Sequence, residues 1–254
     1  MYVIIPARIG STRLPEKPLR EIAGKPLIQH VYDRALASGA ERIIIATDDQ
    51  RVSQAASGFG ADVCMTSTEH RSGTERIAEV VRQLELADDT VIVNLQGDEP
   101  LMPPSLIRAV ADVLVARLEA AVATVMHAIS DRNALLDPNV VKVVCDHAGF
   151  ALYFSRAPIP WDRKGSPKGK HAFRPDMAFR HIGLYAYRAG FVTRYASWPP
   201  CPLEEGEQLE QLRVLWYGER IVVCEADEAP GPGVDTPEDL EQVRQILETV
   251  RGEE

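Results

Sequence analysis

A loop near the start of the chain combines three cationic side chains with two hydroxyls. Arg8, Arg13 and Lys17 lie in it together with Ser11 and Thr12. Backbone N–H groups of such a loop can donate to phosphate oxygens, while Arg and Lys balance the negative charge. The spacing matches neither a Walker A motif nor a dinucleotide-binding glycine motif. The loop therefore predicts a phosphate site of another kind, and the alternative is an exposed basic loop without a ligand.

Two carboxylates far along the chain could hold a cation beside a bound phosphate. Asp98 follows a buried apolar run and a glycine, and Asp235 stands in a Gly-Val-Asp-Thr-Pro turn. Mg²⁺ suits such a pair because it takes few protein ligands and completes its shell with water and phosphate oxygens. Each residue also has a simpler interpretation, because Asp98 could cap the segment from Pro100 and Asp235 could mark the entry to a helix at Thr236.

Strand and helix patterns alternate in the first half of the chain, which is typical of a mostly parallel sheet. The predicted strands are 2–5, which Pro6 is expected to end, 42–46, 61–65 at an edge, 91–95 and 120–129. The predicted helices are 26–37, 50–57, 77–86, with Ser72 or Thr74 as its cap, and 104–118. Ligands of such sheets bind at the carboxyl ends of the strands, so the basic loop, 47–48, 96–99 and the turn at 233–236 should converge there.

The second half has more aromatic strands and fewer helices. Its predicted strands are 140–146, 150–155, 181–187 and 221–225, and its predicted helices are 206–217 and 236–250. Thr236 and Pro237 form a good cap and first position for the last helix. The basic, Gly- and Pro-rich segment 161–175 indicates a flexible loop. The predicted class is α/β, with helices on both faces of the sheet and a smaller β-rich subregion.

Composition excludes some classes of function. The 254 residues have 45% hydrophobic content and a net charge of −9, which argues against a nucleic-acid partner. An anionic ligand would be held by local cations, because the first residues are basic and the last ones acidic. There is no signal peptide and no apolar run long enough to span a bilayer, which favours a cytoplasmic protein without membrane insertion.

The four cysteines lie far apart without a C-x-x-C pair, which indicates reduced thiols. Cys64, Cys145 and Cys224 stand in apolar contexts, so we expect them to pack in the core. Cys201 lies between two prolines, and we expect it to be exposed.

Four strings of sequence together resemble one family. IPARIGSTRLPEKPL, HRSGTERIAE, VNLQGDEP and the late VDTPEDL are similar to the 3-deoxy-manno-octulosonate (Kdo) cytidylyltransferases, the CMP-Kdo synthetases of lipopolysaccharide synthesis. The first string alone resembles many sugar nucleotidyltransferases, whereas HRSGTER and LQGDEP are more specific. The resemblance covers nearly the whole chain. It implies a Rossmann-like, glycosyltransferase-A-like sheet in a single domain over 1–254, with a substrate or dimerisation subregion inserted at about 130–215.

The family joins CTP to Kdo and releases diphosphate, when the anomeric hydroxyl of the sugar attacks the α-phosphorus in line. The resemblance also implies that the protein requires Mg²⁺, forms a homodimer and binds CTP and Kdo. It assigns catalysis to Arg13, Lys17, Asp98 and Asp235, and the two aspartates would hold Mg²⁺, expected as two ions. The residues implied to contact the nucleotide are Ala7, Arg8, Ser11, Arg13, Lys17, Arg71, Ser72, Gly73, Thr74, Gln96, Gly97 and Asp98.

Kdo is a carboxylic acid, so its site requires a cation as well as partners for many hydroxyls. Within the resemblance, Arg156 after the FALYFS strand is the expected carboxylate partner. The candidates for the sugar hydroxyls are Gln96, His181, Tyr185, Glu204, Glu207 and Gln208. Tyr185 could instead be a core residue, His181 the start of a strand, and Glu207 with Gln208 the start of an exposed helix. No side chain stands out as a general base.

Three other functions fit parts of the pattern. A sialic-acid cytidylyltransferase would use the same chemistry, and Arg156 with the strand at 181–185 should select the acid sugar. A non-catalytic nucleotide-binding protein could share the fold, although Lys17, Asp98 and Asp235 together speak against it. A retaining metal-dependent glycosyltransferase is less suited, because the basic loop favours a free triphosphate.

Overall fold

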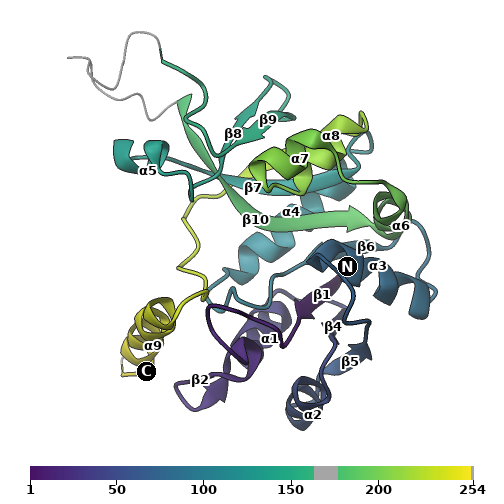
Figure 1. Ribbon diagram of the computed structural model, residues 1–254, viewed down its shortest axis with the longest axis vertical. Helices are drawn as coiled ribbons and strands as arrows, with labels where there is room; N and C mark the ends of the chain where they lie inside the picture. Colours follow the sequence, from purple (N-terminus) through teal and green to yellow (C-terminus); the bar gives the residue numbers. More distant parts are fainter. Residues whose placement is uncertain (163–176, 253–254) are drawn as a thin grey trace. The chain divides into compact units, whose positions relative to one another are not determined.

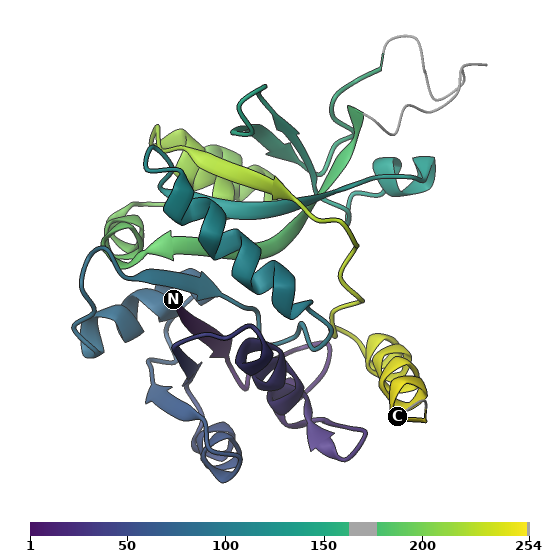
Figure 2. The ribbon, with the colours of Figure 1, turned by 180° about the vertical axis from the view of Figure 1, so that it is seen from behind.

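The computed structural model describes residues 1–162 and 177–252, and the chain folds as two compact units. Unit 1 consists of Met1–Asp112, Ala186–Ala196 and Pro230–Glu254, and unit 2 of Val113–Tyr185 and Ser197–Ala229. Figures 1 and 2 show the elements from opposite sides. Most of the predicted subregion at 130–215 falls within unit 2. Its role in substrate binding or dimerisation, and the single domain over 1–254, stay predictions.

Four parallel strands form the centre of unit 1. They stand in the order β6 (Val91–Asn94), β1 (Tyr2–Ala7), β4 (Arg42–Thr47) and β5 (Asp62–Met65). β1 is inside this sheet, and its Val3, Ile4 and Ile5 are fully buried. Short β-branched runs favour this position, because both faces of a parallel sheet are covered by helices. β5 lies at the edge, as predicted.

Helices connect these strands and cover both faces of the sheet. The connecting helices are α1 (Leu27–Ala37), α2 (Gln50–Gly58) and α3 (Gly73–Gln83). The connections from β1 to β4 and from β4 to β5 run in one direction along the sheet, whereas the connection from β5 to β6 runs back. Because such connections are right-handed, α3 lies on the face opposite α1 and α2. The other helices with residues in unit 1 are α4 (Pro104–Ala116), α6 (Ala189–Ser197) and α9 (Pro237–Gly252). The predicted α/β class is confirmed.

The last segment of the chain packs against the first in unit 1. After β1 come a short 3-10 helix η1 (Lys17–Leu19) and a hairpin of β2 (Glu21–Ile22) and β3 (Lys25–Pro26). One apolar cluster joins this region to the start of α1 and to α9; its buried members are Leu14, Ile22, Leu27, Val234, Val243 and Leu247. The C-terminal segment is therefore part of the same core as the basic loop.

Unit 2 contains the β-rich part of the protein. β7 (Val122–Ala128) and β11 (Ile221–Glu225) pair in parallel, and β10 (Phe179–Arg188) is the next neighbour of β7. β8 (Lys142–Cys145) pairs antiparallel with both β10 and β9 (Ala151–Ser155). Three short helices complete the unit: α5 (Arg132–Leu136), α7 (Pro202–Glu207) and α8 (Gln211–Trp216).

Several predicted boundaries were wrong for local reasons. Pro6 does not end β1. The pairing of β1 with β6 stops at Ile4 and Asn94, so at Pro6 β1 pairs only with β4. A proline, which has no N–H, therefore leaves no hydrogen bond of the sheet unmade at this position. α3 begins at Gly73 rather than at residue 77, and Ser72, one of the two predicted caps, is confirmed as its cap, since Ser72 Oγ accepts the N–H of Glu75 at 3.3 Å.

The predicted helix 206–217 is two helices, α7 and α8. Gln208 ends the first of them in the left-handed region, with φ at 54°. The hairpin β2–β3, α5 and α6 were not predicted at all. The predicted flexible loop over 161–175 falls mainly on residues 163–176, which lie outside the described residues.

All four cysteines are free thiols, as predicted. Cys201 is buried, with 1% of its surface exposed, so the expectation of an exposed thiol was wrong. It precedes α7, and its backbone N–H approaches the buried carboxylate of Glu204 at 3.4 Å. None of the helices in the described part of the chain has the length and apolarity that crossing a bilayer requires.

Candidate active site

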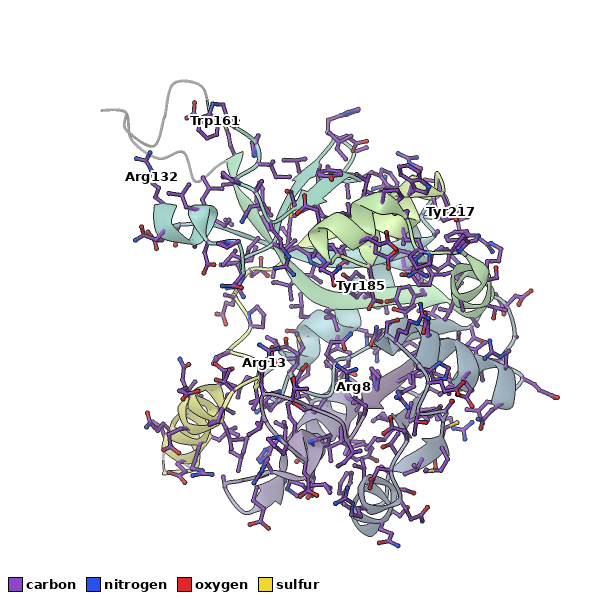
Figure 3. The ribbon with its side chains drawn as sticks, viewed as in Figure 1. Arg8, Arg13, Arg132, Trp161, Tyr185 and Tyr217 are labelled. Atoms are coloured by element: carbon purple, nitrogen blue, oxygen red, sulfur yellow. The ribbon has the colours of Figure 1, made fainter. Side chains whose placement is uncertain are left out.

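The basic loop begins where β1 ends, and β4 fixes its first residues. Thr47 Oγ1 donates to the carbonyl oxygen of Ala7 at 2.7 Å. Asp48 Oδ1 accepts the backbone N–H of Ile9 at 3.1 Å. Figure 3 labels Arg8 and Arg13 on this loop, and both side chains are exposed. The strand ends thus hold the loop backbone while the guanidinium group of Arg8 stays available to a ligand.

A buried ion pair stands behind this anchor. Arg76 Nη2 and Asp48 Oδ2 are 2.8 Å apart, and only 3% and 9% of the two side chains are exposed. Arg76 also donates to Thr66 Oγ1 and to the carbonyl oxygen of Ser67. The pair therefore connects α3, the end of β4 and Ile9 of the loop. We did not predict it, although a charged residue among the buried positions of α3 was a signal that could have been used.

We expect Asp48→Asn to destabilise the protein by about 2 kcal/mol, because it leaves Arg76 buried with a weaker partner. Urea unfolding would measure the loss of free energy. Asp62→Asn is the matched control, since Asp62 forms an ion pair with Arg42 at 2.9 Å on the exposed sheet edge. The control should change stability by less than about 0.5 kcal/mol. Equal losses in the two variants would contradict the role given to burial.

The other end of the loop is also fixed. Ser11 Oγ accepts the N–H of Leu14 at 3.3 Å, and Leu14 is buried in the cluster shared with α9. Glu16 then takes a left-handed conformation, with φ at 57°, and η1 begins at Lys17. This turn directs the chain back, so that Lys17 lies with 16% of its side chain exposed.

The turn after β6 depends on a close backbone approach. Glu99 N–H donates to the carbonyl oxygen of Gln96 at 3.2 Å. A Cβ atom on Gly97 would lie 2.7 Å from the carbonyl oxygen of Pro6, so only glycine fits at this position. The carbonyl oxygen of Asp98 accepts the N–H of Val234 at 2.8 Å. Asp98 is thereby held beside both β1 and the C-terminal segment.

The second carboxylate is placed by the cap of α9. Asp239 Oδ2 accepts the N–H groups of Asp235 and Thr236 at 3.0 and 2.9 Å, and Thr236 Oγ1 accepts the N–H of Asp239 at 3.2 Å. This reciprocal arrangement is a capping box, so Thr236 is the cap, as predicted. The carboxylate of Asp235 takes no part in this cap and is therefore free to contact Lys17 and Arg13.

Lys17 brings the two carboxylates together. Its Nζ lies 2.7 Å from Asp98 Oδ2 and 2.9 Å from Asp235 Oδ1. Arg13 Nη2 lies 2.9 Å from Asp235 Oδ2. We call Arg13, Lys17, Asp98 and Asp235 the clasp. The structure thus places the four residues that were assigned to catalysis in one continuous set of ion pairs within unit 1, and their catalytic roles stay predictions.

The ion pairs of the clasp favour the charged forms of Lys17 and Asp235. Burial alone would lower the pKa of Lys17, but the charge and hydrogen bond of Asp98, with those of Asp235, outweigh it and raise that pKa. Burial alone would raise the pKa of Asp235, but Lys17 and Arg13 outweigh it and lower that pKa. An ammonium therefore stands between two carboxylates, at the place where a bound cation was expected.

The other predicted nucleotide contacts lie around the same sheet edge. Arg71 is exposed, Thr74 is buried, and a Cβ atom on Gly73 would lie 3.2 Å from Cγ of Pro6. Gln96 Nε2 donates to Asn94 Oδ1 at 3.2 Å, so its amide is oriented by a buried neighbour. No ligand tests these contacts, and they stay predictions.

Unit 2 holds most of the predicted sugar-binding residues, and Arg156 is at their centre. Its Nε donates to the carbonyl oxygen of Glu207 at 2.7 Å, and its Nη1 donates to that of Pro138 at 2.9 Å. The carboxylate of Glu207 accepts the N–H of Arg156 at 2.8 Å and the hydroxyl of Ser155 at 2.6 Å. Arg156 and Glu207 are thus joined by both side chains and backbone.

Glu204 and Gln208 have other partners in the structure. Glu204 is buried, and its two oxygens accept from Nε and Nη2 of Arg213 at 2.6 and 2.5 Å. This bidentate pair fixes α7 against α8. Gln208 is exposed, and its side chain donates to the carbonyl oxygen of Glu205 at 2.8 Å. The predicted sugar contacts of both residues stay predictions.

His181 and Tyr185 lie on β10, where Figure 3 labels Tyr185. The ring of His181 stands 5.0 Å from that of Phe154, edge to face, and 5.4 Å from that of Tyr185. Thr124 Oγ1 lies 2.9 Å from the Leu184 carbonyl oxygen and 2.9 Å from Nε2 of His181. The hydroxyl has one proton, and we expect it to donate that proton to the carbonyl and to accept from a protonated Nε2 of His181.

We expect His181 to stay neutral throughout the neutral range, because burial lowers its pKa to about 3. The unfolded chain would bind this proton near the ordinary pKa of 6.5. Acid therefore favours unfolding, and the contribution of His181 to stability falls as the pH drops from 6.5 toward 3. Imidazole NMR, assigned with His181→Gln, should show one neutral tautomer with the proton on Nε2 down to pH 5. A charged ring at pH 6 would refute this assignment.

Comparison with known proteins connects this geometry to a family. A family model described as cytidylyltransferase matches residues 2–221. The 3-deoxy-manno-octulosonate cytidylyltransferase of Pasteurella multocida is 58% identical over 253 residues, which cover 97% of this chain and 98% of its own. The protein of the same name from Vibrio vulnificus is 58% identical over 245 residues, 96% of this chain and 97% of its own. The chain belongs to the 3-deoxy-manno-octulosonate cytidylyltransferase family.

A solved structure agrees with this cytidylyltransferase assignment. It is that of CMP:2-keto-3-deoxy-manno-octonic acid synthetase complexed with CTP. The two folds match with a TM-score of 0.88 and 44% sequence identity, over 97% of this chain and 98% of the other. The resemblance on which the sequence interpretation depended is therefore confirmed over nearly the full length.

The clasp of this cytidylyltransferase fits Mg²⁺ by its chemistry. Two carboxylate oxygens from separate segments lie within 3 Å of one ammonium nitrogen, so a small cation can be contacted by both. Within residues 1–162 and 177–252, no three His, Cys, Asp or Glu side chains form a group that could hold a metal. A metal held by Asp98 and Asp235 would thus complete its shell with water and phosphate oxygens, as Mg²⁺ commonly does.

Proposed function

We propose that this protein transfers CMP from CTP to 3-deoxy-D-manno-octulosonate (Kdo) and releases diphosphate. The observation that carries the proposal is the clasp, which joins two cations of the basic loop to two distant carboxylates at the carboxyl edge of a parallel sheet. Membership of the 3-deoxy-manno-octulosonate cytidylyltransferase family supports both the nucleotide and the sugar.

The basic loop would bind the triphosphate. Arg8 makes no ion pair with any side chain in the described part of the chain, so its guanidinium can take phosphate oxygens directly. Arg13 and Lys17 would exchange their carboxylate partners for phosphate oxygens when CTP binds. Mg²⁺ held by Asp98 and Asp235 would neutralise phosphate charge and favour attack at the α-phosphorus.

The reaction itself exchanges one bond for another. The anomeric oxygen of Kdo forms a bond to the α-phosphorus, the bond from that phosphorus to the bridging oxygen breaks, and diphosphate leaves with its electron pair. We propose that the hydroxyl proton passes to solvent. The residues of the clasp therefore act by holding groups in line and by balancing charge.

Arg156 would bind the carboxylate of the sugar. It is half-buried, and its Nη2 engages no acceptor among the described residues, whereas Nε and Nη1 are both committed to carbonyl oxygens. A guanidinium fixed at two nitrogens and open at the third is oriented before the ligand arrives. We extend the proposal to an Mg²⁺-dependent, cytoplasmic homodimer that supplies activated Kdo for lipopolysaccharide synthesis.

The test is an assay of the purified protein with CTP, Kdo and Mg²⁺. Phosphorus NMR should show diphosphate and a new phosphodiester, and mass spectrometry should give the mass of CMP-Kdo. Omission of Kdo, or its replacement by the sialic acid N-acetylneuraminate, should abolish diphosphate release. Addition of EDTA should do the same. Diphosphate released equally with sialic acid, or without any sugar, would refute the proposal.

A further inference from the structure

Lys142, on β8, is fully buried, and the proposed reaction does not use it. Its Nζ donates to the carbonyl oxygens of Asp137 at 2.8 Å, Arg156 at 2.6 Å and Val140. An ammonium has three N–H donors, so these three carbonyls satisfy it completely. Burial lowers the pKa of Lys142, while the charge of Asp137 opposes that shift. The side chain therefore serves backbone oxygens and no carboxylate of a ligand.

These carbonyls belong to the segments that also hold the guanidinium of Arg156. Lys142 binds the turn 137–140 at both of its ends, and Pro138 in the middle of that turn accepts from Arg156 Nη1 at 2.9 Å. The third bond of Lys142 goes to the carbonyl oxygen of Arg156 itself, at 2.6 Å. One ammonium thus fixes both the backbone of Arg156 and the turn that orients its side chain.

A purely packing role does not explain this arrangement. An apolar side chain of similar length would fill the space without the cost of moving an ammonium out of water. A buried cation is stabilised here by these three carbonyl oxygens, of which that of Asp137 also accepts the N–H of Val140 at 3.2 Å. The bonds from Lys142 fix the positions of these oxygens. One of them belongs to Arg156 itself, and another belongs to Asp137, next to the Pro138 that contacts Arg156.

We propose that Lys142 is a positioning residue for Arg156 and acts on the acid sugar only through it. The proposal rests on the proposed function of Arg156 as partner of the sugar carboxylate. Loss of Lys142 should release the turn 137–140, so that Arg156 Nη1 loses a fixed acceptor and Nη2 loses its direction. Affinity for the acid sugar should fall, while CTP, bound by residues of unit 1, should be unaffected.

The kinetic test uses Lys142→Met, which keeps length and volume but removes all three donors. The KM for Kdo should rise by about tenfold and the KM for CTP by less than about twofold. Ile221→Val, a buried truncation on β11, is the control for general loss of stability in unit 2 and should leave both values unchanged. If Lys142→Met does not fold, Lys142→Gln, which keeps two donors without the charge, carries the same comparison.

A double-mutant cycle separates positioning from any independent effect. In an Arg156→Ala background, Lys142→Met should change the KM for Kdo by less than about twofold, because the residue through which it acts is gone. An effect that persists in full in this background would overturn the proposal. So would a folded Lys142→Met protein with the unaltered KM for Kdo.

A spectroscopic measurement decides the matter without catalysis. The Nε–H signal of Arg156, identified by its loss in Arg156→Lys, should exchange slowly with water in the unaltered protein. In Lys142→Met it should exchange at least about tenfold faster, because the backbone of Arg156, whose carbonyl oxygen Lys142 holds, is no longer fixed and the bond from Nε to Glu207 opens more often. An unchanged rate would overturn the proposal. If the unaltered protein made no CMP-Kdo, the proposed function would fail, and this measurement would still decide the role of Lys142.

Discussion

Asp98→Asn should reduce kcat by about a thousandfold and weaken CTP binding only slightly. The substitution keeps the shape of the side chain and removes the charge that Lys17 contacts at 2.7 Å. Its main effect should fall on the transition state, where the phosphate charge is redistributed and a carboxylate-held cation is needed most. Steady-state kinetics with varied Mg²⁺, together with equilibrium titration of CTP, would separate the two effects.

Asp33→Asn is a suitable control for Asp98→Asn. Asp33, on α1, pairs with Lys25, on β3, at the same distance of 2.7 Å, also in unit 1, but both side chains are more exposed. This variant should keep full turnover. Near-normal turnover in Asp98→Asn, or a loss confined to CTP affinity, would show that Asp98 serves only to hold Lys17.

Arg156→Ala should lower kcat/KM for Kdo by about a hundredfold, with no more than a twofold change in the KM for CTP. The guanidinium is the expected partner of the sugar carboxylate, and its truncation leaves that charge without a cation. Arg156→Lys should recover part of the loss, because it restores charge without the planar fork. The ratio of the effects on the two substrates is the quantity to measure.

Arg220→Ala provides the control for Arg156→Ala in unit 2. Arg220 stacks over the ring of Phe150 at 3.5 Å and lies 3.9 Å from Asp146, so its loss removes a cation without touching Arg156. Kinetics with Kdo should remain as in the unaltered protein. An unchanged kcat/KM for Kdo in Arg156→Ala would remove Arg156 from the sugar site and leave that carboxylate to another cation.

The parts of the site that could be predicted are those with a local signal. Three such parts are the basic loop, the LQGDEP turn and the cap of α9 at Thr236. Each is formed by a few consecutive residues, so residue types and their order were sufficient to predict it. That they meet follows from a parallel sheet, whose strand ends share one edge. The same logic predicted that Lys17 would lie near Asp98 and Asp235, and the structure shows this proximity.

The missed parts depend on partners distant in the sequence. Arg76 and Asp48 look like ordinary surface charges until α3 and β4 are packed together. In the sequence, Lys142 is a single polar residue in a predicted strand. Its burial is explained only by the folded turn 137–140, whose carbonyl oxygens accept from its ammonium group. The break at Gln208 was missed because a left-handed non-glycine residue has no strong sequence signal. For Arg76 with Asp48 and for Lys142, the deciding contacts come from segments that only the folded chain brings together.

The shared core of the basic loop and α9 has a consequence for synthesis of the protein. Val234, Val243 and Leu247 complete the cluster that holds Leu14, and Asp235 completes the clasp, so both ends of the polypeptide are required in one unit. A ribosome that has made the first 234 residues has not yet supplied the second aspartate. The clasp can therefore assemble only after Asp235 has been synthesised, and the apolar cluster around Leu14 is complete only once Val243 and Leu247 have joined it.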